Sequence, residues 1–554
     1  MVLGLHLDGG AVQSASIIGN RDTDGPEPLV TSNPSTGEVL ATVRALDAAG
    51  ARAAVEAASA AFPSYSRTTF QERQRLLARW LSIMVDERLA LAELVARENG
   101  KPVSEALLVD VFPACDALAY LARHTHRLLR FEPVRPRQVL FAHWKAGYRF
   151  DPLGVVAVIA PWNYPVAIPV IEVAAALAAG NTVVFKPASA TVLTGLALAD
   201  MARRAGFPPG VFNAVALPGR ATDALVDDPR VAKVLFTGSV EVGRRVAQRC
   251  AARLAPCQLE LGGKDAAVVA ADAHLERTAR GLVWGAFMNS GQTCASIERV
   301  YVEEKVFEPL LARVVELTRG LKVGDPLAAD TDLGPMTTAE QREEVHRQVA
   351  GAIAGGARAL TGGTLPEGVG LYYPPTVLVD VHDEMDVMRE ETFGPVLPLV
   401  PVADLDEGVR RANASRFGLT ASVWTRSRAT ALRLQRELEA GVVTVNDHVV
   451  AFGEVTGSWG GLRDSGIGRS HGRYGLLELC NIKYVTLDDG TDQAMPWYYP
   501  YDEDFGRFIR AGIPALYGVG RQKIAALVDL VRTRRFRWRA RLGSIVANAD
   551  RLFP

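Results

Sequence analysis

The chain is poor in cysteine, and the few cysteines it has are badly placed for pairing. Among 554 residues there are 5, an odd number, with no Cys-X-X-Cys pair and no Cys/His zinc spacing. They are Cys115, Cys250, Cys257, Cys294 and Cys480. Scattered cysteines exclude a disulfide framework and indicate free thiols in a reducing compartment. We therefore expect a cytoplasmic protein without a metal site.

The sequence also lacks an excess of charge of either sign and a long apolar run. Its formal net charge is −1, so no overall field attracts nucleic acid. The longest apolar run, residues 165–179, contains Glu172 and is too short to span a bilayer. The first 26 residues contain no basic segment followed by an apolar run, so we expect no signal peptide. The apolar share of 48% is that of an ordinary globular protein.

Short apolar runs alternate with helical patterns through most of the chain. Strands are predicted at 155–160, 182–185, 211–215 and 234–236, with helical runs at 168–179, 192–205 and 221–226 between them. Further strands are predicted at 299–302, 376–379, 396–402, 421–424 and 442–445. This alternation is typical of parallel sheets covered by helices on both faces. Because the chain is too long for one core, we predict two α/β domains that meet near Gly262 and Gly263.

The first part of the chain is predicted to be largely helical. Helical spacing covers residues 48–62, 71–99 and 104–129, and the turn at 100–102 ends the second of these runs. Residues 134–148 have extended character without a core pattern. We interpret them as an arm that packs outside its own domain.

Two residues are candidates for chemistry, although each has a simpler interpretation. Cys294 lies on a polar, Gly-containing bend after an apolar helical run; a thiol there is either an exposed nucleophile or a small buried apolar residue. Glu260 lies between leucines, just before two glycines. A carboxylate at that place either faces outward from an alternating strand or has a partner or a catalytic task.

Polar residues follow several of the predicted strands. Asn163, between aromatic residues and prolines, is either a turn residue or an amide that stabilises an oxyanion. Lys186 suits the ribose or phosphate of a nucleotide, or is a solvated loop lysine. Residues 238–243 join a strand to a helix whose N–H groups can face a diphosphate, but they do not match Gly-X-Gly-X-X-Gly. Ligands bind beyond the carboxyl ends of such strands, so these residues indicate one ligand site.

Five motifs occur in an order that carries a family resemblance. They are Pro-Trp-Asn-Tyr-Pro at 161–165, Phe-Thr-Gly-Ser at 236–239, Leu-Glu-Leu-Gly-Gly-Lys at 259–264, Gly-Gln-Thr-Cys at 291–294 and Glu-Thr-Phe-Gly-Pro at 391–395. From about residue 33 to about residue 488 the chain resembles the aldehyde dehydrogenase superfamily, in its NAD(P)-dependent, non-CoA-acylating form.

The resemblance implies an α/β subunit with a Rossmann-like cofactor domain, an α/β catalytic domain and a small β oligomerisation hairpin. The implied boundaries are 27–133 and 151–261 for the cofactor domain, 134–150 and 475–490 for the hairpin, 262–474 for the catalytic domain and 491–554 for a C-terminal extension. A homodimer or homotetramer, built by sheet extension between subunits, is implied as well.

The implied activity is oxidation of an aldehyde to a carboxylic acid with hydride transfer to NAD(P). By this resemblance Cys294 attacks the aldehyde and carries the thiohemiacetal and then the thioester. The Asn163 amide and the Cys294 N–H hold the oxyanion, and Glu260 activates water. CoA-acylating oxidation is a rival interpretation, but it needs no water-activating Glu260. A non-catalytic protein on the same fold would need none of the three residues.

The resemblance also assigns the cofactor residues. They are Trp162, Lys186, Ser189, Gly238, Ser239, Gly243, Glu391 and Phe393. Lys186 is implied to bind the adenosine ribose, Ser239 the diphosphate and Glu391 the nicotinamide ribose. Ser189 stands where the family often has Glu, which repels a 2′-phosphate. We therefore expect the protein to use NAD or NADP, with NADP tolerated or favoured.

The tail beyond Asp488 is something the core family does not need. It contains an aromatic cluster at 497–501 and an Arg-rich helical pattern at 523–547, with Phe536 and Trp538. We interpret the pattern as a solvated helix packed on protein, or as a basic helix in peripheral contact with an anionic membrane. The aldehyde itself stays open: residues 446–447 and the tail favour aliphatic or aromatic aldehydes, and residues 186–198 favour semialdehydes.

Overall fold

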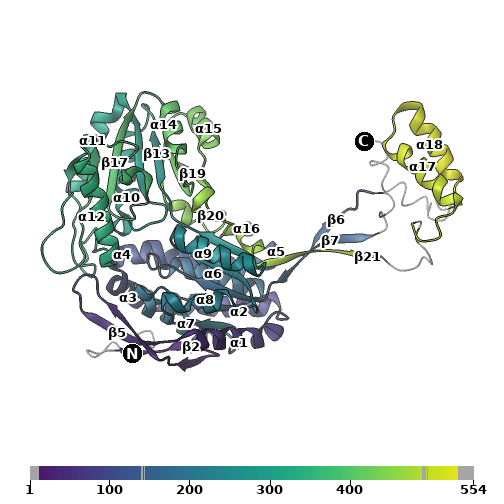
Figure 1. Ribbon diagram of the computed structural model, residues 1–554, viewed down its shortest axis with the longest axis horizontal. Coiled ribbons are helices and arrows are strands. Elements are labelled where there is room, and N and C mark those ends of the chain that lie inside the picture. Colours follow the sequence, from purple (N-terminus) through teal and green to yellow (C-terminus); the bar gives the residue numbers. More distant parts are fainter. Residues whose placement is uncertain (1–11, 139–140, 142–143, 489–494, 496, 535–554) are drawn as a thin grey trace. The chain divides into compact units, whose positions relative to one another are not determined.

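The computed structural model describes residues 12–138, 141, 144–488, 495 and 497–534. The chain divides into two compact units, which are described separately. The first contains Met1–Leu128 and Asp151–Asn481, and the second contains Leu129–Phe150 and Ile482–Pro554. Figure 1 shows the elements by their labels.

The first unit contains a sheet of eight strands around a parallel centre. In spatial order the strands are β20 (Gly466–Ile467), β12 (Cys257–Glu260), β11 (Val231–Thr237), β8 (Val155–Ile159), β9 (Thr182–Lys186), β10 (Phe212–Ala214), β2 (Ser16–Ile18) and β3 (Arg21–Thr23). The run from β12 to β10 is parallel, and β20 and β2 flank it antiparallel. The four strands predicted in this region are confirmed, because their apolar residues are buried on both faces.

Helices cover both faces of this sheet. On one face α1 (Ala48–Tyr65), α8 (Asp223–Val226) and α9 (Val240–Ala252) pack on odd-numbered residues of β8, such as Ala157 and Ile159. On the other face lie α6 (Ala167–Ala179) and α7 (Val192–Ala205). Nearly every residue of α6 is buried, since α5 (Phe112–Leu128) and α2 (Phe70–Asp86) pack outside it. The face under α6 is the one that carries Thr237 and Glu260.

A second sheet of seven strands lies in the same unit. Its order is β15 (Arg358–Thr361), β16 (Thr376–Val379), β17 (Val396–Val402), β14 (Ile297–Glu303), β13 (Asp265–Val269), β18 (Thr420–Trp424) and β19 (Val442–Val445). All neighbours are parallel except β15. The helices α10 (Leu275–Phe287) and α11 (Glu304–Arg319) cover one face, and α12 (Ala339–Ala354), α14 (Leu405–Asn413) and α15 (Arg428–Glu437) cover the other. Short helices α13 (Asp386–Arg389) and α16 (Gly472–Leu477) complete the unit. The α/β fold class is thereby confirmed.

Strand β13 was missed by the sequence analysis, although it lies between β14 and β18 inside the second sheet. Its two alanines have no strand preference of their own. Pairing with a neighbour on each side and burial of all five residues hold Asp265–Val269 extended.

The prediction of a largely helical N-terminal part is wrong for the residues before α1, and two of its predicted helical runs are interrupted. Residues before α1 form strands: besides β2 and β3, a three-stranded sheet contains β1 (Val12–Ser14), β5 (Val39–Ala45) and β4 (Glu27–Ser32). The run predicted at 71–99 is two helices, α2 and α3 (Arg88–Asn99), because Glu87 leaves the helical conformation with φ −98° and ψ 11°.

The run predicted at 104–129 is also interrupted. It contains α4 (Val103–Ala106), a π-helical turn (Leu107–Val111) and then α5. A π turn shifts the register of side chains by one residue and is frequent at functional sites. Here it points Leu108 and Val109 into a cavity described below.

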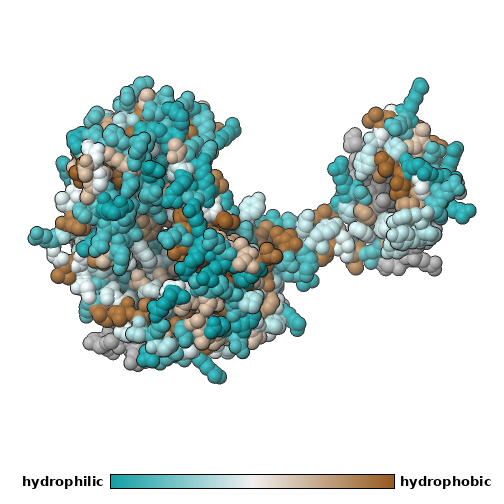
Figure 2. All heavy atoms as spheres, in the orientation of Figure 1, coloured by the Kyte–Doolittle hydropathy of each residue, from teal (hydrophilic) through white to brown (hydrophobic). Residues whose placement is uncertain are grey.

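The second unit consists of a small sheet and a helical hairpin. The sheet has the order β21 (Cys480–Leu487), β7 (Lys145–Pro152) and β6 (Glu132–Val134), and Trp144 Nε1 donates to Asp488 at 3.3 Å. The hairpin comprises α17 (Glu503–Tyr517) and α18 (Gly520–Arg532), which share a core. Apolar side chains remain exposed on this hairpin (Figure 2).

The helix predicted at 523–547 begins earlier and is followed only to Arg532 in α18. Phe536 and Trp538 lie outside the described residues. No helix in the described part of the chain combines the length and the apolar character needed to cross a membrane. The domain boundaries given above stay a prediction.

Candidate active site

Cys294 stands on a bend that few residues can adopt. Asn289, Ser290 and Gly291 follow α10 with φ angles of 53°, 53° and 70°, in the left-handed region that side chains disfavour. Gly291 is needed for a second reason, since a Cβ there would lie 2.1 Å from the Gly394 carbonyl oxygen. The bend before Cys294 is thus pressed against the loop that carries Glu391 and Phe393.

The end of β12 reaches the same point through two glycines. A Cβ on Gly263 would lie 2.6 Å from the Cys294 carbonyl oxygen, and one on Gly262 would lie 2.2 Å from Glu391 Oε2. Glu260 precedes this crossing by two residues. Three motifs that are far apart in the sequence therefore converge on the cysteine.

The Cys294 thiol is surrounded by acids. Burial raises its pKa, and the nearby carboxyls of Glu391, Asp265 and Glu260 raise it further. The resting sulfur is accordingly a neutral thiol, and it must lose its proton before it can attack a carbonyl carbon.

Asn163 is buried beside this bend and tightly held. Its Nδ2 donates to the Gln292 carbonyl oxygen at 3.0 Å. The backbone carbonyl oxygen of Asn163 accepts from Lys101 Nζ at 2.8 Å and from Asn289 Nδ2 at 2.9 Å. Lys101 is in turn paired with Asp110 at 2.5 Å. These bonds hold Asn163, with its side-chain amide bonded to Gln292, two residues before Cys294.

The sequence analysis missed this support for Asn163. By sequence alone Lys101 belongs to a turn that ends a helix, and Asp110 belongs to the helical run that follows it. Asp110 also accepts from the Val166 and Ala167 N–H groups at 3.1 and 2.8 Å, at the start of α6. No local pattern identifies such a network, because its members come from separate elements.

Glu260 ends β12 in a buried position, and neither of its carboxyl oxygens lies within normal hydrogen-bonding distance of a donor in the described part of the chain. Burial raises its pKa well above the ordinary value, and the charge of Glu172 adds to the effect. The positive charge of Arg469 and the Gln258 side chain oppose it. Burial of this carboxyl therefore favours its protonated form.

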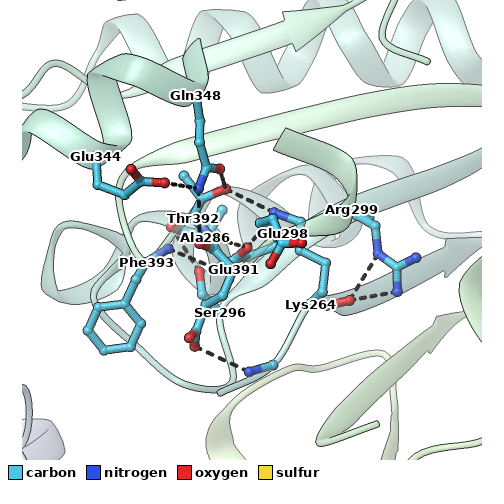
Figure 3. Close-up of polar contacts among 12 residues, drawn as sticks. Lys264, Ala286, Ser296, Glu298, Arg299, Glu344, Gln348, Glu391, Thr392 and Phe393 are labelled. Carbon is cyan, nitrogen blue, oxygen red and sulfur yellow. Dashed lines mark hydrogen bonds and ion pairs between the residues drawn. The ribbon is translucent and has the colours of Figure 1, made fainter. Parts of the chain in front are cut away.

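The loop of Glu391 and Phe393 is fixed from behind by a buried ion pair (Figure 3). Glu298 pairs with Lys264 at 2.5 Å and accepts from the N–H groups of Thr392 and Phe393 at 2.8 and 3.0 Å. Glu391 Oε1 accepts from the Gly263 N–H at 3.2 Å. Glu298 and Lys264 are further residues that the sequence analysis did not identify.

The structure also brings Phe393 against Trp162. Their rings meet edge to face with centroids 5.4 Å apart. Trp162 follows β8 and Phe393 precedes β17, so this contact joins the two sheets of the unit next to Asn163.

The remaining cofactor candidates lie at the carboxyl ends of β9 and β11. Lys186 is buried at the end of β9; burial lowers its pKa to about 8, and no carboxylate among the described residues pairs with it. Ser189, three residues on, opens a 3₁₀ turn (Ser189–Thr191) and is half-buried. An unpaired ammonium beside a hydroxyl fits a phosphate or ribose group.

Ser239 caps α9, where its hydroxyl accepts from the Val242 N–H at 3.4 Å. It is exposed and Gly238 half-buried, so the first turn of α9 is open to an anion such as a diphosphate. Gly243 has a packing role, because a Cβ there would lie 2.5 Å from Leu261 Cδ2. It lets α9 lie close to the end of β12.

A cavity of about 360 Å³ opens at Cys294. Its walls come from the π turn, α6, α10 and the segment after β19. They include Leu108, Val109, Phe112, Tyr164, Ile168, Trp284, Met288, Val449, Val450, Phe452 and Trp459. None of the described lining residues is charged. In the described part of the chain, no group of three or more potential ligands is placed to hold a metal ion.

The chain has relatives among known proteins. The family model described as the aldehyde dehydrogenase family matches residues 21–485. The chain belongs to the aldehyde dehydrogenase family. The dehydrogenase is 38% identical to an aldehyde dehydrogenase of Paenarthrobacter nicotinovorans, over 82% of its own length and 99% of that protein. It is 34% identical to the NADP-dependent succinate-semialdehyde dehydrogenase of Escherichia coli, over 84% and 95% of the two chains.

Solved structures agree. An NADP-dependent enzyme of Escherichia coli matches with a TM-score of 0.83 and 34% identity, over 86% of this chain and 98% of that one. An aldehyde dehydrogenase of Bacillus cereus, solved as an NAD⁺ complex, matches with a TM-score of 0.83 and 33% identity, over 86% and 97%. The dehydrogenase thus oxidises an aldehyde with NAD or NADP as cofactor. Residues after 485, including α17 and α18, lie beyond the family match.

The acidic surroundings of Cys294 generate a testable prediction. We expect the rate of alkylation of Cys294 by iodoacetamide, without cofactor, to keep rising above about pH 9. The raised pKa of this thiol means that its thiolate forms at higher pH than that of an ordinary cysteine, whose pKa is about 8.5. Glu391→Gln removes the carboxyl whose charge raises the pKa of Cys294 most, and it should speed alkylation at pH 8 by about 3- to 10-fold. Mass spectrometry of the labelled peptide measures the rate.

Glu391→Asp is the matched control, since it keeps the charge and should change the rate little. Cys294→Ala identifies the signal of this cysteine. An unchanged rate in Glu391→Gln would contradict the assignment.

Proposed function

We propose that this dehydrogenase oxidises an apolar aldehyde to the carboxylic acid through a thiohemiacetal and a thioester on Cys294. The observation that carries the proposal is the apolar cavity whose lining includes this cysteine. Glu260 is close enough to the thiol to raise its pKa. Bound NAD(P) supplies the hydride acceptor.

In the first half of the reaction the Cys294 thiol gives its proton to a water molecule, and its sulfur bonds to the aldehyde carbon. The carbonyl oxygen becomes an oxyanion, which the Asn163 Nδ2 and the Cys294 N–H stabilise. The fixed position of Asn163 supports this role, because a donor held in place needs no reorganisation as the charge develops. When the oxyanion collapses, hydride leaves the carbon and a thioester remains.

In the second half Glu260, as the carboxylate, takes a proton from water. The water oxygen bonds to the acyl carbon, the carbon–sulfur bond breaks, and the sulfur and the acid are released. The crossing of Gly263 against the Cys294 carbonyl supports this role, since it brings the strand of Glu260 to the thioester.

The substrate class follows from the lining of the cavity. Leu108 and Phe112, with exposed fractions of 59% and 69%, extend the apolar surface to the mouth. A second carboxylate on the substrate would be buried there without a cation among the described lining residues, which is costly. Medium-chain aliphatic and aromatic aldehydes fit this surface, whereas one relative is named for succinate semialdehyde.

We therefore expect kcat/KM to rise by about 3- to 4-fold per methylene from propanal to hexanal, because each buried methylene contributes about 0.8 kcal/mol. Succinic semialdehyde should be at least about 100-fold poorer than hexanal. Reduction of NADP, measured at about 340 nm where the reduced nicotinamide absorbs, gives both values. Equal or better turnover of succinic semialdehyde would overturn the apolar assignment, and Val450→Arg at the mouth should favour it relative to hexanal.

We also propose that NADP is used at least as well as NAD. Ser189 follows Lys186 by three residues and carries a small uncharged hydroxyl, which does not repel a 2′-phosphate as a carboxylate at that position would. A relative and a solved neighbour that are described as NADP-dependent support this cofactor choice.

Ser189→Glu should lower the preference for NADP over NAD by about 10- to 100-fold, since a carboxylate facing a phosphate costs several kcal/mol. Ser189→Gln controls for size without charge and should shift the ratio much less. The ratio of kcat/KM values for the two cofactors is the measurement. A wild-type enzyme that uses NADP far less well than NAD would contradict the proposal.

We further propose a homodimer or homotetramer formed by sheet extension, in the cytoplasm. Support comes from β21, an edge strand whose Ile482, Tyr484 and Leu487 are 52%, 48% and 64% exposed, because such an edge pairs readily with another chain. Light scattering on the intact protein should give two or four times the chain mass, and a monomer would refute the proposal.

We interpret the α17–α18 hairpin as packing on protein, with peripheral membrane contact as the alternative that liposome flotation tests.

A further inference from the structure

A second buried carboxyl, Glu172, lies beside Glu260. Glu172 is the one charged residue of α6, and it is 5% exposed. Its Oε1 accepts from the Thr237 hydroxyl at 3.1 Å. Its Oε2 has no hydrogen-bond partner in the described part of the chain. A buried, half-satisfied carboxyl is costly in a helix that otherwise serves as core, so a task for it is worth seeking.

The register of β11 and β12 places this carboxyl. Thr237 pairs directly with Glu260 across the two parallel strands, and paired residues point to the same face of a sheet. The hydroxyl that binds Glu172 is thus the immediate cross-strand neighbour of Glu260. Gln258, two residues before Glu260, shares that face and lines a small cavity together with Glu172. The cavity, about 30 Å³, has room for a water molecule.

No cation is hydrogen-bonded to either carboxyl among the described residues. Arg469 is close enough to lower the pKa of Glu260, but its Nη1 donates to the carbonyl oxygens of Gly461 and Gly468. His471 lines the same cavity and is neutral at physiological pH, because burial lowers its pKa to about 4.

The other acid near Glu260 is Glu478, whose side chain is 37% exposed and paired with Lys233. Water and the lysine screen its charge. Glu172 is therefore the neighbour whose charge Glu260 feels most.

Two carboxyls that share a dry site resist ionising together. Burial raises the pKa of Glu172 to about 8, while the Thr237 hydroxyl favours its charged form. Glu260 has no such donor within normal hydrogen-bonding distance, and burial and the charge of Glu172 both raise its pKa. The Thr237 hydroxyl therefore favours ionisation at Glu172, whose charge opposes the ionisation of Glu260.

We propose that Glu172 is a positioning residue that keeps the proton on Glu260 and so sets the pH above which Glu260 can accept a proton from water. The proposal rests on the function of Glu260 proposed above. The hydrolytic step itself is unchanged: water gives its proton to the Glu260 carboxylate as the carbon–oxygen bond forms and the carbon–sulfur bond breaks. Glu172 touches neither the thioester nor the water.

The test isolates hydrolysis from binding and hydride transfer. p-Nitrophenyl acetate acetylates Cys294 without cofactor. The decay of the acetyl adduct is followed by intact-protein mass spectrometry between roughly pH 6 and pH 10, a range chosen to include the titration of both acids. In Glu172→Gln the acidic limb of the decay rate should move down by about one pH unit or more. The plateau at high pH should fall, because a carboxylate of lower pKa is a weaker base.

Two further variants make the result decisive. Glu478→Gln removes an acid that is exposed and paired, and it should move the limb by less than about 0.3 units. Thr237→Val leaves Glu172 in place but removes the hydrogen bond that favours its charge. It should therefore move the limb in the same direction as Glu172→Gln, and it replaces that variant if Glu172→Gln does not fold.

An acidic limb that stays in place in Glu172→Gln, or that moves up, would overturn the inference while leaving the proposed function intact. The proposed function fails separately if the wild-type protein forms no acetyl adduct that Cys294→Ala abolishes, or reduces no NAD(P) with any aldehyde.

Discussion

The structure around Cys294 depends on how closely three backbones approach one another. Gly262, Gly263 and Gly291 stand where a single additional carbon would lie between 2.1 and 2.6 Å from Glu391, Cys294 or Gly394. A side chain at Gly263 or Gly291 would meet the backbone of Cys294 or Gly394, and one at Gly262 would displace the Glu391 carboxyl. The close approach puts the end of β12, the bend after α10 and the loop before β17 within reach of one sulfur. Catalysis on this fold is thus a consequence of missing side chains as much as of those present.

Burial has an electrostatic consequence at this crossing. The carboxyls of Glu260, Glu391 and Asp265 surround the cysteine, and Glu172 lies behind Glu260. In a dry site their like charges hold protons on one another and on the thiol. A site at rest in this way avoids several buried negative charges at once.

Specificity and support come from elements outside the five motifs. The apolar cavity draws on the π turn (Leu107–Val111), α6, α10 and the segment after β19. The loop with Glu391 and Phe393 rests on the buried pair of Glu298 and Lys264. The α17–α18 hairpin extends past residue 485, where the family match ends.

The sequence by itself determined the α/β class, most central strands and the family. Short continuous apolar runs such as 155–159 are typical of strands buried between two layers, and motifs retain their order whatever surrounds them. Tertiary structure alone decided the conformation of β13 and of the N-terminal strands, since their residues have weak preferences that pairing overrides. It also decided that Glu172 meets Glu260 and that Lys101 holds Asn163. The first contact joins residues about 88 positions apart in the chain, and the second joins residues about 62 positions apart. No local pattern records a contact made across a sheet.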